Sequence, residues 1–218
     1  MVILLVYMDD IIITGTDFGL ITKLHMKDLG QLTYYLGLEV LNTPKSIFLN
    51  QHKYIQDLIT LAGLEDTSSV ATPMEINVNY RKDEGTLLDD PTIYRRLVGS
   101  LIYLTITRPN ISYVVHQVSQ FMSSPRYLHL AAVRRIIHYL RGSPARGLFF
   151  PTGSALRLVA YNDADWAECP DTHRSTVGWC MFLGDALISW KCKKQDWVSK
   201  SSNEAEYHTM FTACSEVI

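Results

Sequence analysis

Two adjacent carboxylates, Asp9 and Asp10, stand between two short apolar runs near the start of the chain. Runs rich in branched residues favour β-strands, so we expect the pair at the turn between two strands. A turn accepts Asp for an ordinary reason, because its carboxylate bonds to nearby backbone amides. Two like charges on a rigid hairpin also repel each other, and a hard divalent cation would offset that cost. Turn chemistry and metal binding are therefore the two alternatives for this pair.

Positive charge is concentrated in the middle of the chain. Residues 1–90 carry 6 Lys and Arg against 13 Asp and Glu, and residues 151–218 carry 6 against 9. Residues 91–150 carry 8 Arg and no acidic residue, although the whole chain has a net charge of only -2. A purely cationic block predicts a surface that faces a polyanion. The alternative is a helical region that uses Arg on its solvent face.

The remaining composition predicts a globular chain. With 218 residues and 47% hydrophobic residues, one or two domains can each have a core. The four cysteines show no Cys-x-x-Cys spacing, so free thiols in a reducing compartment are expected. No uncharged apolar run approaches the ~20 residues of a membrane span, and no basic segment precedes the first apolar run. We therefore expect a soluble, intracellular protein with no membrane partner.

The first half of the chain predicts strands followed by one helix. Residues 32–40, interrupted by Gly37, and residues 47–49 are typical of a hairpin. A glycine within a strand marks a bulge or the close approach of another backbone. Residues 51–62 have helical spacing. Residues 64–90 are polar and turn-rich, and we interpret them as a linker-like loop.

The second half predicts three helices and then a β-rich end. Asp90 followed by Pro91 favours a helix start, and Pro109 favours another. A third helix is predicted over residues 128–141. Further along, the expected elements are a strand leading into Asp163, a hairpin over 175–192, and a helix that carries Glu206 after a capping box at Ser201.

In this order, several motifs resemble the Pol polyprotein of copia-type LTR retrotransposons, from the middle of the reverse transcriptase into ribonuclease H. The resemblance covers nearly the whole chain. The motifs that carry it are Tyr7-Met8-Asp9-Asp10, Met26-Lys27-Asp28-Leu29-Gly30, Tyr35-Leu36-Gly37-Leu38-Glu39, Tyr94-Arg95-Arg96-Leu97-Val98-Gly99-Ser100-Leu101, Thr107-Arg108-Pro109-Asn110-Ile111-Ser112-Tyr113, Asp163-Ala164-Asp165-Trp166-Ala167, Arg174-Ser175-Thr176 and Ser201-Ser202-Asn203-Glu204-Ala205-Glu206-Tyr207.

The resemblance implies two Mg²⁺-dependent sites for phosphoryl transfer. Asp9 and Asp10 match the catalytic metal ligands of the polymerase. Asp163 and Glu206 match catalytic metal ligands of ribonuclease H, which cleaves the RNA strand of an RNA–DNA hybrid. Asp165 is the weaker match because it lies where the strand ends. Without the surrounding motifs, Glu206 would be interpreted as a helix-surface glutamate near a cap.

The resemblance also implies contacts with nucleic acid. Gly37 matches the primer-gripping hairpin, where a glycine lets a nucleic-acid backbone approach closely. The arginine-rich helices match the thumb and connection, which hold a duplex through its phosphates. The residues expected to make these contacts are Arg95, Arg96, Arg134, Arg135 and Arg141.

Together these expectations describe an α+β chain made of truncated palm and thumb hairpins, basic helices and an incomplete ribonuclease H-like fold. The predicted divisions are a remnant of the palm and primer grip at 1–63, the linker-like loop at 64–90, the basic thumb and connection at 91–150, and a partial ribonuclease H domain at 151–218.

Relative to the family pattern, we expect one further palm aspartate and the later ribonuclease H ligands to lie outside this chain. A two-metal site without a bridging carboxylate should bind Mg²⁺ weakly. Three hypotheses follow. The chain is an enzyme fragment that is inactive in isolation, a catalytically dead remnant that binds an RNA–DNA hybrid or other nucleic acid, or a non-functional relic of a transposable element.

Overall fold

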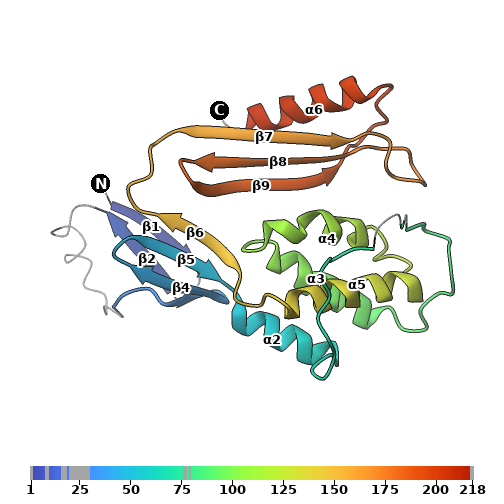
Figure 1. The fold of residues 1–218 in the computed structure, drawn as a ribbon, viewed down its shortest axis with the longest axis horizontal. Coiled ribbons are helices and arrows are strands. Elements are labelled where there is room, and N and C mark those ends of the chain that lie inside the picture. The colour runs from blue at the N-terminus through green and yellow to red at the C-terminus, as the bar shows by residue number, and fades with distance from the viewer. Residues whose placement is uncertain are drawn as a thin grey trace.

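The computed structural model describes residues 2–7, 10–15, 19, 30–75, 78 and 80–216. In these residues the chain forms antiparallel sheets that lie beside a unit of helices (Figure 1). The first sheet pairs β1 (Val2–Tyr7) with β2 (Asp10–Gly15), and Tyr7 lies opposite Asp10. A mixed fold of helices and antiparallel sheets is therefore confirmed.

The second sheet contains a turn that the sequence analysis missed. Its strands, in spatial order, are β3 (Tyr34–Tyr35), β4 (Leu38–Thr43), β5 (Ser46–Asn50) and β6 (Gly147–Pro151). The pairing of β4 with β5 agrees with the predicted hairpin. Residues 32–40 do not form one strand with a bulge, however. Leu36 and Gly37 have φ of 49° and 79°, and two consecutive positive values match a tight hairpin turn.

The helical unit follows the predicted spacing closely. It consists of α2 (His52–Leu61), α3 (Thr92–Leu104), the short 3-10 helix η1 (Pro109–Ile111), α4 (Ser112–Ser119) and α5 (Tyr127–Arg141). The Asp90 carboxylate accepts a hydrogen bond from the Thr92 amide at 2.8 Å, which satisfies a free donor at the start of α3. The helices predicted from residues 51, 90, 109 and 128 are confirmed.

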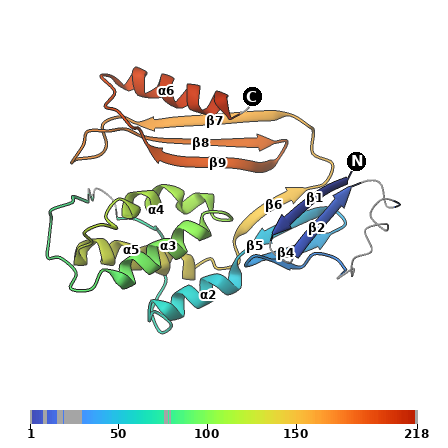
Figure 2. The same ribbon diagram turned by 180° about the vertical axis from the view of Figure 1, so that it is seen from behind.

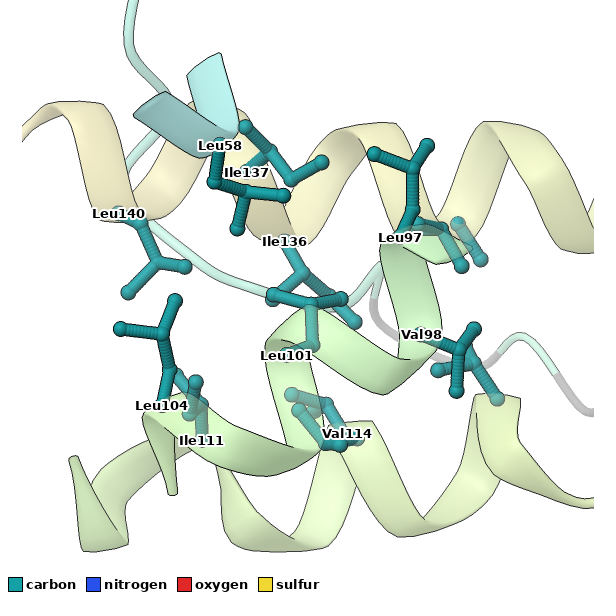
Figure 3. Close-up of a cluster of buried hydrophobic side chains, with 14 of the residues drawn as sticks. Leu58, Leu97, Val98, Leu101, Leu104, Ile111, Val114, Ile136, Ile137 and Leu140 are labelled. Atoms are coloured by element: carbon teal, nitrogen blue, oxygen red, sulfur yellow. The ribbon is translucent and has the colours of Figure 1, made fainter. Parts of the chain in front are cut away.

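The main core lies where these helices meet. Leu97, Leu101 and Leu104 recur at helical spacing on α3 and are almost completely buried. Figure 3 shows them packed with Val114 of α4 and with aliphatic side chains of α5. Burying each such side chain contributes about 1.5–3 kcal/mol of hydrophobic free energy. This cluster is the largest apolar contribution to stability in the described part of the chain.

The described residues within 64–90, a segment that we call the strap, run along α5. Arg141 donates to the Leu64 carbonyl at 2.6 Å, near the end of α5. At the other end, the Tyr127 amide donates to the Thr86 carbonyl at 3.0 Å. Further contacts from α5 and its cap to the strap come from Arg126, His129, Arg135 and His138. The described residues of the segment interpreted as linker-like are thus bonded to α5 and its cap at several points.

The third sheet packs against α4 and also contacts β6, and the last helix packs on the third sheet. The strands are β7 (Leu158–Asp165), β8 (Thr176–Leu183) and β9 (Ala186–Lys194), followed by α6 (Ser202–Ser215). Both views show α6 beside β7, on the side away from α4, while β9 faces α4 (Figures 1 and 2). The Ser201 hydroxyl accepts a hydrogen bond from the Glu204 amide at 3.2 Å, as the capping motif predicts.

The cysteines and the helix lengths bear on two predictions made from composition. All four cysteines are free thiols, as predicted. Among the residues that the structure describes, no helix is long and apolar enough to cross a membrane.

Candidate functional site

Helix α6 brings one predicted ligand to the strand that carries the other. The Glu206 carboxylate accepts a hydrogen bond from the Ala164 amide at 3.3 Å. Ala164 lies between Asp163 and Asp165 at the end of β7. Glu206 reaches this strand because α6 packs on β7 and β8 through Ala205, Thr209 and Ala213, which are buried. Glu206 thus contacts the backbone of β7 one residue after Asp163, whereas Asp163 itself lines the groove described below.

The two aspartates at the end of β7, Asp163 and Asp165, favour a cation nearby. Burial raises the pKa of Asp165 above its usual range, and the neighbouring charge of Asp163 raises it further. Carboxylates that disfavour each other's ionisation are stabilised by a positive charge between them. Their oxygens are also the hard donors that Mg²⁺ prefers. The residues therefore fit such an ion in chemical type, although no group of three or more His, Cys, Asp or Glu in the described residues is arranged to hold a metal.

A groove of about 450 Å³ opens beside these carboxylates, between the third sheet and the start of α4. Asp163 and Asp165 lie on its wall, and most of the remaining lining is apolar or aromatic, including Tyr113 and Trp190. Cys192 also lines the groove. Burial raises the pKa of that thiol to about 12, with help from Glu168 and Asp165, so the thiol stays protonated at neutral pH.

The structure says little about the two carboxylates predicted for the polymerase site, Asp9 and Asp10. Asp9 lies outside the residues that the structure describes, and Asp10 is known here only as the first residue of β2. The motif at residues 26–30 also falls outside the described residues except for Gly30.

The fold itself requires a glycine at position 37. Its positive φ is required by the turn, and a Cβ at this position would lie 3.0 Å from the Tyr103 hydroxyl oxygen of α3. The same hydroxyl donates a hydrogen bond to the Leu36 carbonyl. In this structure the close neighbour of Gly37 is therefore a protein side chain. A contact with nucleic acid remains a prediction.

The predicted phosphate-binding arginines divide into two groups. Arg96 and Arg134 are exposed and make no hydrogen bond or ion pair with any residue that the structure describes. The other three donate to protein acceptors. Arg95 bonds to the Met122 carbonyl, Arg135 to Glu75 and Thr72, and Arg141 to Leu64 and Thr67. Among the five predicted arginines, the two without a partner in the described residues are Arg96 and Arg134.

Comparisons with known proteins agree with the motif order. Residues 1–76 match the family described as Reverse transcriptase (RNA-dependent DNA polymerase). The chain is 44% identical over 224 residues to the Retrovirus-related Pol polyprotein from transposon RE1 of Arabidopsis thaliana, covering 99% of this chain and 15% of that protein. The corresponding polyprotein from transposon TNT 1-94 of Nicotiana tabacum is 36% identical, over 94% of this chain and 17% of that protein. An uncharacterized mitochondrial protein of Arabidopsis thaliana is 38% identical, and the match covers 98% of this chain and 92% of that protein.

The chain belongs to the copia-type retrotransposon Pol family. This Pol segment spans about 15% of the length of the RE1 polyprotein that it matches. The predicted family and the reverse transcriptase assignment are therefore confirmed. No solved structure matches the chain.

The Pol segment contains a buried arginine that residue-based reasoning did not anticipate. Arg108 is only 1% exposed. Its guanidinium donates to the Ser143 carbonyl at 2.8 Å, to the Ser143 hydroxyl at 3.0 Å and to the Asn110 side chain at 3.2 Å. These bonds tie the end of α3 to the end of α5. The motif at 107–113 was a signal of ancestry, but an isolated Arg in a sequence usually indicates the surface.

A polar junction between α4 and β9 was also missed. The His116 imidazole Nε2 accepts a hydrogen bond from the Lys194 amide at 3.0 Å. Burial lowers the pKa of His116, and the charges of Lys194 and Lys193 lower it further. The Lys194 ammonium contacts Gln120 and lies 2.8 Å from the Cys169 sulfur. This junction joins the third sheet of the Pol segment to its helical unit.

Proposed function

We propose that this Pol segment contributes nucleic-acid contacts and metal-ligating carboxylates to a reverse transcriptase with an adjoining ribonuclease H. The observation that supports the ribonuclease H part is the hydrogen bond from the Ala164 amide to the Glu206 carboxylate, since Ala164 directly follows Asp163 on β7. For the polymerase part, the support is the Tyr7-Met8-Asp9-Asp10 motif within the matched residues 1–76. Asp9 and Asp10 are the proposed metal ligands there.

Asp163 and Glu206 are the residues that would hold Mg²⁺ in the ribonuclease H part. When bound, the metal supplies an activated water and stabilises negative charge on the cleaved phosphate of the RNA strand. The protein fixes the carboxylates on two rigid elements, β7 and α6. The loop after β7 is held as well, because the Trp166 indole donates to the Ser199 carbonyl at 3.0 Å.

The isolated chain is proposed to be catalytically inactive. Mg²⁺ takes six oxygen ligands in near-ideal octahedral geometry. Asp163 and Glu206 supply two carboxylates of that sphere, with Asp165 as a third acidic neighbour whose raised pKa disfavours its charged form. Weak metal binding follows from such a set, and weak binding leaves a water poorly aligned for attack.

The proposed nucleic-acid surface is centred on Arg96 of α3 and Arg134 of α5. Their guanidinium groups are exposed and unpaired within the described residues, so phosphate contacts displace no protein partner. Arg95, Arg135 and Arg141 contribute positive potential while they hold the fold. The ligand we propose is an RNA–DNA hybrid, and the duplex would be held through its phosphates.

The direct test is cleavage of a labelled RNA–DNA hybrid with Mg²⁺ or Mn²⁺, with Asp163→Asn as the control. We expect no cleavage by either protein, and hybrid binding that weakens steeply as salt is added. Arg96→Ala combined with Arg134→Ala should weaken binding by about tenfold or more at low salt. Cleavage that disappears in Asp163→Asn would overturn the proposed inactivity and would show that the carboxylate set is complete.

The second candidate is a catalytically dead nucleic-acid-binding protein. The free arginines favour it because they need no metal to bind phosphates. In that case binding to the hybrid is unchanged by Asp9→Asn and by the removal of divalent ions. A relic without function would instead unfold with poor cooperativity and show no salt-dependent affinity for nucleic acid.

A further inference from the structure

A second, smaller pocket lies on the face of the third sheet that α6 covers. It has a volume of about 140 Å³ and lies between β9, the loop after β9 and α6. Lys191 and Lys193 line it from β9, and His208 lines it from α6. Lys191 is paired across the sheet with Trp179, and directly opposed residues of an antiparallel sheet share a face. The pocket adjoins the groove beside Asp163, because Val177, Trp179 and Lys191 line both, but Asp163 and Asp165 line only the groove.

Two lysines give this pocket positive charge, and each lysine forms only a weak, exposed ion pair. The Lys191 ammonium lies 3.4 Å from Glu216, and the Lys193 ammonium lies 3.2 Å from Asp196. All four side chains are between 43% and 70% exposed. Ion pairs so open to water contribute little free energy, so a phosphate can replace the carboxylate as the partner of either lysine.

An aromatic surface stands beside those lysines. Trp197 lines the pocket and is 50% exposed, and its ring packs edge-on against His208 with ring centroids 4.9 Å apart. A half-exposed indole held by a neighbouring ring is a rigid platform on which a nucleobase can stack.

A third observation comes from the floor of the pocket. Trp179 lines it and is only 6% exposed, and its indole Nε1 has no hydrogen-bond acceptor among the described residues. A buried N–H donor without a partner costs about 1–3 kcal/mol. An acceptor oxygen or nitrogen of a bound ligand would remove this cost.

We propose that this pocket binds one unpaired nucleotide of a single-stranded nucleic acid, with its base stacked on Trp197 and its phosphate between Lys191 and Lys193. The proposal rests on the nucleic-acid binding proposed above and adds a single-strand site in the smaller pocket, next to the groove that Asp163 lines. A volume of about 140 Å³ accommodates one base. A base within a duplex is already stacked and cannot enter, so the site discriminates single strands from duplexes.

The test is fluorescence titration of the full chain with a short oligodeoxythymidine, beside a titration with an RNA–DNA duplex. Trp197→Ala should weaken oligodeoxythymidine binding by about tenfold, since one base stack corresponds to a factor of roughly 5 to 150. Phe211→Ala, which removes an exposed aromatic of α6 outside the pocket, should leave it unchanged. Duplex binding should be the same in all three proteins.

Variants that change the charge of the pocket test the phosphate contact independently of the base stack. Lys193→Ala should weaken single-strand binding and reduce the slope of log affinity against log salt by about 0.7, the value for one phosphate on a single strand. Lys200→Ala, an exposed lysine outside the pocket, is the matched control. Asp196→Asn should strengthen binding several-fold because it removes a carboxylate that competes for Lys193.

The outcomes separate the two proposals. If the chain binds duplex and oligodeoxythymidine but Trp197→Ala and Lys193→Ala bind as the wild type does, the pocket is wrong and the arginine surface stands. If the wild type binds neither ligand at low salt, both proposals fail.

Discussion

Arg108 shows how one residue can stabilise this Pol segment without a charged partner. Its guanidinium is buried and pairs with neutral acceptors at the ends of α3 and α5, and burial lowers its pKa. Arg108→Met keeps the length of the side chain but leaves the Ser143 carbonyl and the Asn110 side chain without their donor. We expect a loss of about 2–4 kcal/mol in the free energy of unfolding, measured by urea denaturation. A change below about 0.5 kcal/mol would mean that these bonds contribute nothing.

His116 predicts how stability depends on pH. Burial, followed by the charges of Lys194 and Lys193, lowers the pKa of His116 in the folded chain. The unfolded chain, with a His pKa near 6.5, therefore takes up the proton first as pH falls. The contribution of His116 is complete above about pH 6.5 and is lost as pH falls toward the lower folded value.

The measurement is the free energy of unfolding between about pH 7.5 and about pH 5. The wild type should lose stability across this window. His116→Gln keeps an acceptor for the Lys194 amide but does not titrate, so its loss should be smaller. Burial lowers the pKa of His129 as well, so that residue contributes a slope of the same sign in both proteins. Identical slopes in the two proteins would exclude His116 as a source.

At this scale, sequence reasoning predicted residues that belong to local motifs. Asp163 and Glu206 were assigned from short motifs. The structure shows Glu206 bonded to the amide next to Asp163, and their role as metal ligands remains a prediction. Arg108 and His116 were missed because their burial depends on partners far along the chain, at Ser143 and Lys194. Local composition carries no signal for such contacts.

At the scale of elements, the turn between β3 and β4 makes opposite predictions for two neighbouring residues. Leu36 pays a steric cost for its positive φ, whereas Gly37 does not. Leu36→Gly should leave stability unchanged or raise it by up to about 1 kcal/mol. Gly37→Ala should lower stability by about 1 kcal/mol or more, because its new methyl group also meets Tyr103. Thermal denaturation of both variants gives the comparison, and a stabilised Gly37→Ala would show that the turn is wrong.

The strap gives a second test at this scale. Arg126 donates to the carbonyls of Lys82 and Gly85 and to the Asp83 carboxylate at 3.2 Å. Arg126→Ala should cost about 1–2 kcal/mol and speed tryptic cleavage of the strap, because fewer bonds then oppose its local opening. Arg134→Ala is the control, since this residue of α5 has no partner in the described residues. Equal cleavage rates in the two variants would mean that Arg126 does not hold the strap.

Helices were easier to predict than the segments between them. The apolar spacing of α2, α3 and α5, together with Asp90 and the prolines, was sufficient to place their starts within a few residues. The strap has no such periodicity. Side chains of α5 and its cap hold it through bonds to its backbone and to the side chains of Glu75 and Thr72. The hairpin turn at Leu36 was missed because a leucine with positive φ runs against its intrinsic preference.

At the scale of the whole molecule, the four predicted divisions are connected in ways that composition does not show. Strand β6 pairs with β5, so that Phe149 lies opposite Phe48 and the two strands that precede and follow the helical unit in the sequence are joined. The third sheet is joined to α4 through His116, and the Trp190 indole donates to the Thr105 carbonyl at 3.1 Å. The division into four segments remains a prediction. Pairing between distant strands is set by tertiary packing, which a single sequence does not display.

The most direct test of the account is the binding of Mn²⁺ by titration calorimetry, because the central claim is a metal site made by Asp163 and Glu206. The titration uses a chain with Asp9→Asn and Asp10→Asn, so that the proposed polymerase ligands do not contribute. We predict weak binding that disappears in both Asp163→Asn and Glu206→Gln and persists in Glu204→Gln, which alters a glutamate of the helix cap. Binding that is unchanged in both Asp163→Asn and Glu206→Gln would contradict the claim.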